Sequence, residues 1–309
     1  MTAPDTMTLG EARRICSTNP LVDTEDIDAT KTNGAEADKK GRINERLAVD
    51  DSNIRKPFTL MSHQNNYILV ASYNFQGWDV SRYQDFFGLD DIETDDLEVQ
   101  FQLSIKTPLA VDLFDNRLDI FAGYTVNSYW QFYNDDASSP FRETNHEPEV
   151  WLQVRPEKLE ILGFSNTVNG IGMNHMSNGQ GGSLSRSWNR VYGFFAFERD
   201  NMAFMIKPWM RIAEDSEDDD NPDITDYYGH GELWLNYSQQ GHTFSFMARN
   251  NLESGFSKGA VELGWSFPIL DYPYLKGYIQ YFSGYGESLI DYNRYVNRIG
   301  VGLQLTDIL

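Results

Sequence analysis

Residues 97–107 read Leu-Glu-Val-Gln-Phe-Gln-Leu-Ser-Ile-Lys-Thr, and apolar and polar side chains alternate without exception over the first ten positions. Successive side chains of a β-strand point to opposite faces, so this period-two pattern predicts a strand with one apolar and one polar face. Residues 118–133 repeat the pattern. Similar segments span residues 67–73, 147–155, 159–175, 187–199, 202–212, 232–237, 243–250, 259–267, 275–282 and 295–305. The sequence therefore predicts an all-β fold of about twelve antiparallel strands.

Two architectures fit such strands, a soluble β-sandwich and a transmembrane up-and-down β-barrel. In a sandwich the apolar faces meet in a core, whereas in a membrane barrel they face lipid and the polar faces line the lumen. Several predicted strands exceed the usual five or six residues, and aromatic residues make up 14% of the chain. Short links such as residues 156–157 alternate with longer loops such as 134–139 and 214–225. These features favour the transmembrane barrel, and a soluble β-sandwich binding protein remains an alternative.

Composition narrows the function classes. The formal net charge of −21 argues against a nucleic-acid partner, because phosphate binding needs a basic face. Acidic loops suit calcium, which prefers oxygen ligands. No apolar run is long enough for a transmembrane helix, and the single cysteine, Cys16, excludes an intramolecular disulfide.

The N-terminal part of the chain differs from the rest. Residues 1–56 are polar and nearly free of aromatic side chains, which predicts a mostly disordered extension before a barrel domain at residues 57–309. The first residues, Met-Thr-Ala-Pro-Asp-Thr, lack the basic start and apolar run of a signal peptide, so none is predicted.

One grouping of His, Ser and Asn could form a nucleophilic site. His175 and Ser177 are two residues apart, so a strand would place both side chains on one face, and a hairpin would bring Asn189 beside His175. Ser177 would be the nucleophile, His175 the general base and Asn189 the group that orients it, with the backbone amides of Asn178 and Gly179 beside the oxyanion. Strand parity predicts that the trio faces outward, which indicates a lipid substrate. The alternative is a passive porin or structural barrel whose polar cluster faces the lumen.

The segments around this trio carry a family resemblance. His-Met-Ser-Asn-Gly at 175–179 and Ser-Arg-Ser-Trp-Asn-Arg at 185–190 are similar to the active-site segment of the outer membrane phospholipase A family. Further similar segments are Ser-Ser-Pro-Phe-Arg-Glu-Thr-Asn at 138–145, Lys-Pro-Trp at 207–209, Asp-Asp-Asn-Pro-Asp-Ile-Thr at 219–225 and Ser-Gly-Tyr-Gly-Glu-Ser-Leu-Ile-Asp-Tyr-Asn at 283–293. The resemblance extends from about residue 57 to the end of the chain.

The resemblance implies a twelve-stranded barrel in the outer membrane of a Gram-negative bacterium. It also implies calcium-dependent hydrolysis of the acyl esters of phospholipids and lysophospholipids, of the phospholipase A1/A2 type, with activation by homodimerisation. In the family pattern Ser177, His175 and Asn189 keep the roles given above, and Gly179 supplies the amide that binds the oxyanion.

The family pattern further implies a set of calcium ligands. They are Ser138 from the opposite protomer, the backbone carbonyl of Gln180, the hydroxyl of Ser185, and Asp220. The chain departs from the pattern at residues 180–184, which lack an acidic residue carried there by the best-known member. It also has Val126 where that member has a Gln at the dimer interface, and it ends on Leu309 in place of the usual aromatic residue.

Overall fold

The computed structural model describes residues 41–306, except 89–92, 137, 157–158, 216, 218, 252–253, 256, 271 and 273. Cys16, Leu309 and the first forty residues of the predicted extension therefore lie outside the described residues.

Twelve long strands account for most of the described residues. They are β2 (Asn66–Asn74), β3 (Leu97–Asp112), β4 (Leu118–Trp130), β5 (Phe141–Val154), β7 (Phe164–Ser177), β8 (Ser187–Arg199), β9 (Met202–Ile212), β10 (Gly231–Gln239), β11 (His242–Asn250), β12 (Gly259–Pro268), β13 (Lys276–Gly284) and β14 (Val296–Thr306). The shorter elements are α2 (Arg42–Asn53), β1 (Met61–Ser62), α3 (Ser81–Phe87), α4 (Leu113–Asn116), β6 (Glu160–Ile161), η1 (Gly182–Leu184) and α5 (Ile224–Tyr228).

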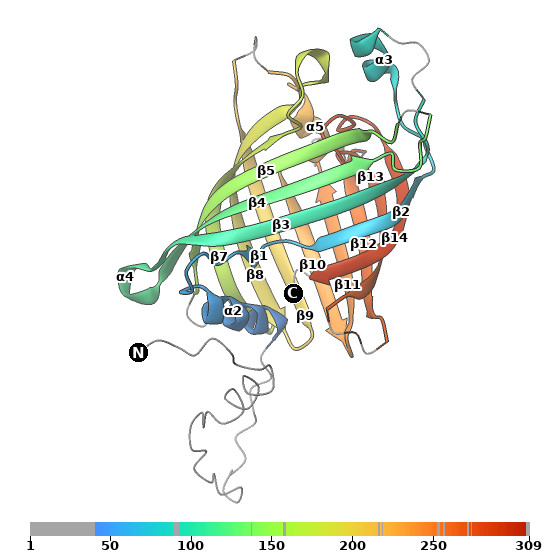
Figure 1. Cartoon of the computed structure of the whole chain (residues 1–309). Coiled ribbons are helices and arrows are strands. Elements are labelled where there is room, and N and C mark those ends of the chain that lie inside the picture. The colour runs from blue at the N-terminus through green and yellow to red at the C-terminus, as the bar shows by residue number, and fades with distance from the viewer. Residues whose placement is uncertain are drawn as a thin grey trace, which may run out of the picture. The chain divides into compact units, whose positions relative to one another are not determined.

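The twelve long strands form a closed antiparallel barrel. Each pairs with the next along the chain, and β14 pairs with β2, so the first and last strands of the sheet close it (Figure 1). Closure satisfies the backbone hydrogen bonds that an open sheet would leave at its edges. The predicted fold class and strand number are confirmed. Among the described helices, none has the length and apolar character that crossing a membrane requires.

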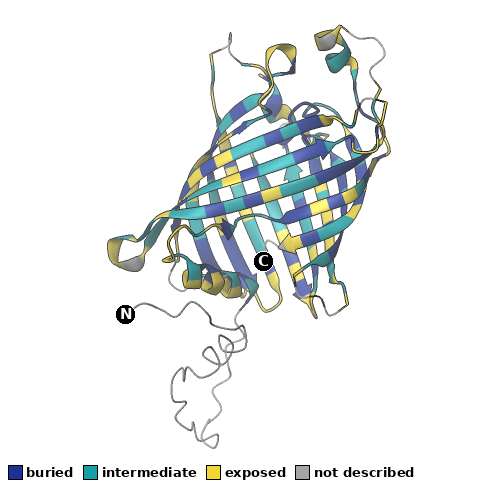
Figure 2. Ribbon diagram, viewed as in Figure 1, coloured by how far each residue is buried: buried dark blue, intermediate teal, exposed yellow. Residues whose placement is uncertain are grey.

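Burial in the barrel is the reverse of that in a soluble sandwich. On β3 the polar Glu98 and Ser104 have no exposed surface, whereas the apolar Leu103 is 48% exposed. Buried and exposed positions alternate along the other strands in the same way (Figure 2). An apolar outer surface around a polar interior is the arrangement that lipid stabilises, so the soluble sandwich is excluded.

The strand links differ between the two ends of the barrel. Short hairpin links, such as residues 200–201 and 240–241, join strands at one end, and long links, such as 178–186 and 213–230, join them at the other. The long links carry η1 and α5. This alternation agrees with the sequence prediction, and it places the loop after Ser177 at the same end as the loop that contains Asp220.

Two predicted strands have different bounds in the structure. The segment predicted as one strand at residues 159–175 contains a tight turn at Leu162 and Gly163, both with positive φ, so β6 folds back and pairs with the start of β7. The strand predicted from residue 147 begins at Phe141 instead. Residues 142–145 are polar and lie among charged partners, so the apolar–polar alternation that predicts a strand is missing from this part of β5.

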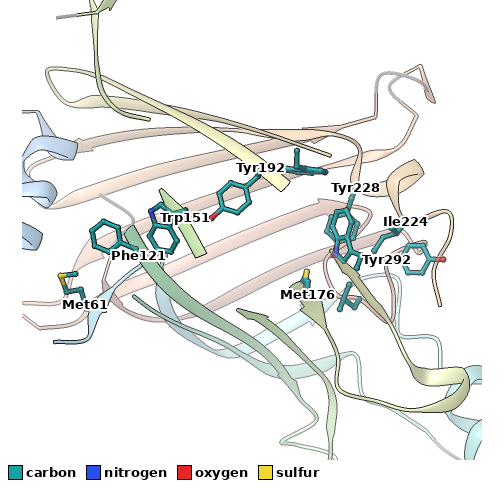
Figure 3. Packing of buried hydrophobic residues seen from close by; sticks show 11 residues of the cluster. Met61, Phe121, Trp151, Met176, Tyr192, Ile224, Tyr228 and Tyr292 are labelled. Atoms are coloured by element: carbon teal, nitrogen blue, oxygen red, sulfur yellow. The ribbon is translucent and has the colours of Figure 1, made fainter. Parts of the chain in front are cut away.

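The lumen is filled by aromatic and charged side chains. Figure 3 shows the main buried apolar cluster, in which Trp151 stacks on Phe121 with ring centroids 5.4 Å apart. Buried ion pairs join segments that are distant in the sequence, as where Arg142 contacts Glu98 at 3.0 Å and Asp291 at 2.6 Å. Two cavities of about 140 and 160 Å³ lie between these side chains. The interior is therefore built as a hydrogen-bonded core.

Helix α2 corrects the prediction that residues up to 56 are disordered. Its apolar residues Ile43 and Leu47 are buried against Val168 and the small side chains of β8 and β9. The Glu198 carboxylate accepts hydrogen bonds from the backbone N–H groups of Ile43, at 2.7 Å, and Asn44, at 3.3 Å, which stabilises the helix N-terminus. Residues 42–53 thus belong to the barrel domain.

A buried ion pair fixes the other end of α2. The Lys106 ammonium of β3 lies 2.6 Å from the Asp50 carboxylate, and both side chains are at most 10% exposed. We expect Asp50→Ala to lower the free energy of unfolding by about 3 kcal/mol, because it leaves a buried cation unpaired. Thermal unfolding in detergent, followed by the gel shift of the heat-modified barrel, measures this loss.

The control for that substitution is Asp51→Ala, one residue further along the helix. Asp51 pairs with Arg155, but the two side chains are 47% and 41% exposed, so the cost should stay below about 1 kcal/mol. The double variant Asp50→Ala/Lys106→Met should recover most of the stability, since it removes the unpaired charge. Equal losses for Asp50→Ala and Asp51→Ala would contradict the assignment of α2 to the folded domain.

Candidate active site

The β7–β8 hairpin brings His175 and Asn189 together. The two residues face each other in the strand register, as do Ser177 and Ser187. His175 Nδ1 lies 2.9 Å from Asn189 Oδ1. An amide oxygen only accepts, so Nδ1 carries the proton in this contact and the Nε2 of a neutral imidazole is left as an acceptor. This tautomer is the one that a general base requires.

The pair lies on the outer face of the barrel, near the end that carries the long loops. Ile171 and Met173 share the face of His175 and are 55% and 51% exposed. Ile212, opposite Asn189 in the register with β9, is 42% exposed. The polar pair is thus bordered by apolar side chains that face lipid, as the alternation of the strands predicted.

Ser177 ends β7, and its hydroxyl contacts the predicted oxyanion amide. The backbone N–H of Gly179 donates to Ser177 Oγ at 3.1 Å. Gly179 has a φ of 65°, a conformation that side chains disfavour. Among the hydrogen bonds of the described residues, none joins Ser177 to His175. Hydrogen bonds between a nucleophile and its base are often long or poorly aligned in free enzymes and tighten when substrate binds.

The loop after Ser177 is held by Asn178. This buried side chain accepts from the backbone N–H groups of Gln180, at 3.3 Å, and Arg186, at 3.0 Å, and it donates to the Leu184 carbonyl at 2.8 Å. Arg186 also donates to the Ser183 carbonyl at 3.1 Å. Burial, and after it the nearby Arg82, lowers the pKa of Arg186, and the guanidinium remains a cation because its ordinary pKa is so high.

Two of the predicted calcium ligands meet in the structure. The Ser185 hydroxyl donates to the Asp220 carboxylate at 2.5 Å. A hydroxyl oxygen and a carboxylate oxygen are ligands of the kind that calcium prefers, so the donor chemistry of this pair fits calcium. Nowhere among the described residues, this pair included, does a group of three His, Cys, Asp or Glu side chains gather that could hold a metal.

The other two predicted ligands lie in exposed loops. Gln180 is exposed, and its backbone N–H contacts Asn178. Ser138 is exposed with a φ of 61°, and its N–H donates to the Asp135 carbonyl at 3.2 Å. Among the described residues no hydrogen bond links Ser138 to Ser185 or Asp220, so its role as a ligand from a second protomer stays a prediction.

The structure adds two residues that the sequence analysis did not find. Glu214 accepts a hydrogen bond from Asn189 Nδ2 at 2.9 Å. His146 of β5 faces Ser177 in the register, and its Nδ1 lies 2.6 Å from the hydroxyl of Tyr124. His146 continues the outward-facing alternation of β5, and this signal could have identified it. Glu214 lies beyond the end of β9, where no strand alternation marks it.

The profile of the phospholipase A1 family matches residues 43–305 of the chain. A phospholipase A1 of Klebsiella pneumoniae is 36% identical over 269 residues, which cover 87% of this chain and 89% of the relative. The outer membrane phospholipase A of Escherichia coli is similar in structure, with a TM-score of 0.74, 35% identity, and coverage of 82% of this chain and all of that one. An outer membrane phospholipase dimer of Salmonella typhi with bound calcium gives a TM-score of 0.75 at 35% identity, covering 84% of this chain and 97% of that one.

The fold and these similarities define an enzyme of the Gram-negative outer membrane, a β-barrel that hydrolyses carboxylic esters. The chain belongs to the phospholipase A1 family. Its residues Ser177, His175 and Asn189 occupy the outward site described above.

Proposed function

We propose that the chain hydrolyses the acyl esters of phospholipids and lysophospholipids with calcium, through Ser177, His175 and Asn189, as a homodimer. The observation that carries this proposal is the contact between His175 and Asn189 at 2.9 Å on the lipid-facing surface. A base and its orienting group on that surface meet a substrate whose ester lies at the membrane interface.

The first half of the reaction is acylation of Ser177. The hydroxyl oxygen attacks the ester carbonyl while His175 Nε2 takes its proton, and Asn189 keeps the imidazole in the required tautomer. The backbone N–H of Gly179, which lies beside the hydroxyl oxygen, would then donate to the oxyanion. His175 returns the proton to the departing alkoxide oxygen, and the product released is a lysophospholipid.

The second half restores the enzyme. His175 takes a proton from water, the hydroxide oxygen attacks the acyl carbonyl, and the bond to Ser177 Oγ breaks as the proton returns to it. The fatty acid leaves, and the serine hydroxyl is regenerated.

The proposed calcium ligands are Ser138 from the second protomer, the Gln180 carbonyl, Ser185 and Asp220. Calcium bound there would supply positive charge near the oxyanion, which matters because Asn189 is neutral where many triads have a carboxylate. Two protomers are needed in this scheme because Ser138 comes from the other one. The dimer of the Salmonella typhi protein, with its bound calcium, supports the proposal by analogy.

Hydrolysis of phosphatidylcholine in detergent micelles tests the proposed function. The purified barrel should release fatty acid and lysophospholipid with calcium present, and cross-linking should recover more dimer under the same conditions. A passive porin would instead make vesicles permeable to small sugars without releasing fatty acid. The filled lumen argues against that second outcome.

A further inference from the structure

We propose that Glu214 is a positioning residue for this site: its carboxylate holds and polarises the Asn189 amide, and so strengthens His175 as a base. The inference rests on the proposed function, because it assigns Glu214 to the same reaction. It extends the predicted trio by one residue from a third segment of the chain.

The geometry forms a relay of two hydrogen bonds. His175 Nδ1–H donates to Asn189 Oδ1 at 2.9 Å, and Asn189 Nδ2 donates to Glu214 Oε1 at 2.9 Å. The second contact settles which end of the amide faces the histidine, since a carboxylate only accepts. Glu214 therefore excludes the flipped Asn189, which would present its N–H₂ to His175 and remove the acceptor.

The position of Glu214 follows from the strand register. Asn189 faces Ile212, the last residue of β9, and Glu214 follows two residues later on the same outward side. Glu214 is partly exposed, and the last outward-facing residues of β9, Met210 and Ile212, are apolar and exposed. A charge at this boundary is less screened than one in open water.

The chemical effect is to give a neutral amide some of the character of an aspartate. A donated hydrogen bond to an anion polarises the Asn189 amide and increases the negative charge on Oδ1. The imidazolium that forms when His175 takes the serine proton is then better stabilised. The full negative charge of Glu214 adds to this effect from the far side of the amide.

Three other titratable residues near the site, Asp219, Asp220 and His146, contact side chains other than Asn189. Asp219 pairs with Arg211 at 2.6 Å, and Asp220 accepts from Ser185. On the opposite side, His146 of β5 contacts a tyrosine hydroxyl. Glu214 differs from these groups because its side chain accepts a hydrogen bond directly from Asn189.

The test compares Glu214→Gln with Asp215→Asn, a matched loss of charge at the exposed neighbouring residue. The measured quantity is kcat/KM for phosphatidylcholine in micelles, determined as a function of pH at saturating calcium. We expect Glu214→Gln to lower the plateau by about 3- to 10-fold and to move the acid limb to lower pH, because the limb reports His175 and removing a nearby anion weakens this base. Asp215→Asn should match the wild type.

Repeating the comparison in an Asn189→Ala background separates positioning from other roles. If Glu214 acts through Asn189, adding Glu214→Gln to Asn189→Ala should change the rate by less than about twofold. If Glu214→Gln lowers kcat/KM as much in the Asn189→Ala background as it does in the wild type, the inference is overturned. An unchanged pH profile for Glu214→Gln also overturns it, as does a loss that higher calcium restores.

The outcomes also separate this inference from the proposed function. A wild type that releases no fatty acid, or a Ser177→Ala variant that keeps full activity, refutes the proposed function and the inference with it. An active wild type, an inactive Ser177→Ala variant and a Glu214→Gln variant identical to the wild type refute the inference alone.

Discussion

Ser177→Ala should abolish phospholipid hydrolysis, with a fall in kcat of about 10³-fold or more. Removal of the hydroxyl leaves the acyl group no oxygen to which it can transfer, so only catalysis by the remaining groups persists. Release of fatty acid from phosphatidylcholine micelles measures the loss. The barrel should stay intact, because the substitution removes one oxygen from an outward side chain at the end of β7.

Ser187→Ala is the matched control for this prediction. Ser187 faces Ser177 in the register and points to the same side of the hairpin, but it has no role in the proposed reaction. The activity of the Ser187→Ala variant should remain within about twofold of the wild type. Both variants should keep the mobility change on heating that marks a folded barrel. Undiminished hydrolysis by folded Ser177→Ala would disprove the assignment of the nucleophile.

Removal of calcium by a chelator should abolish activity without unfolding the barrel, and added calcium should restore it. The proposed ligands lie in loops, whereas the barrel is held by its closed hydrogen-bonded sheet. The Ser185 hydroxyl also donates to Asp220, so the protein's own hydrogen bond joins the two loops. Fatty-acid release and heat-modifiability, measured on the same sample, separate loss of metal from loss of fold.

Asp220→Asn should raise the calcium concentration for half-maximal activity by about tenfold or more, because it removes the one acidic side chain of the proposed ligand set. Asp215→Asn changes the same charge in the same loop and should leave the calcium dependence unchanged. Equal calcium dependence for Asp220→Asn and the wild type would rule out Asp220 as a ligand. Activity that survives an excess of chelator would rule out the whole set.

The strands and the outward site could be predicted because lipid imposes a simple rule on side chains. From Leu97 to Lys106 of β3, the alternation of apolar and polar residues assigns each side chain to the outer or the inner face. The same rule placed His175 and Asn189 on one surface. In the register between β7 and β8, His175 then stands opposite Asn189. Local alternation thus contains most of the information about the barrel and about the contact between His175 and Asn189.

Helix α2 could not be predicted in the same way. Its apolar surface consists of few side chains, chiefly Ile43 and Leu47, and its stability comes from partners distant in the sequence. Glu198 at its N-terminus and Lys106 near its other end are more than fifty residues away. Glu214 escaped prediction for a similar reason, since it lies beyond the end of β9 in an acidic loop where nothing marks one carboxylate as special.

The pairing of β7 with β8 has a consequence for following the folding of this protein. A slip of one residue between these strands would turn one of the two side chains, His175 or Asn189, towards the lumen, because neighbouring residues of a strand point to opposite faces. Fatty-acid release during refolding thus reports native pairing at this hairpin, which total strand content cannot distinguish from a slipped sheet. Turnover is therefore a specific probe of when these two strands reach their final alignment.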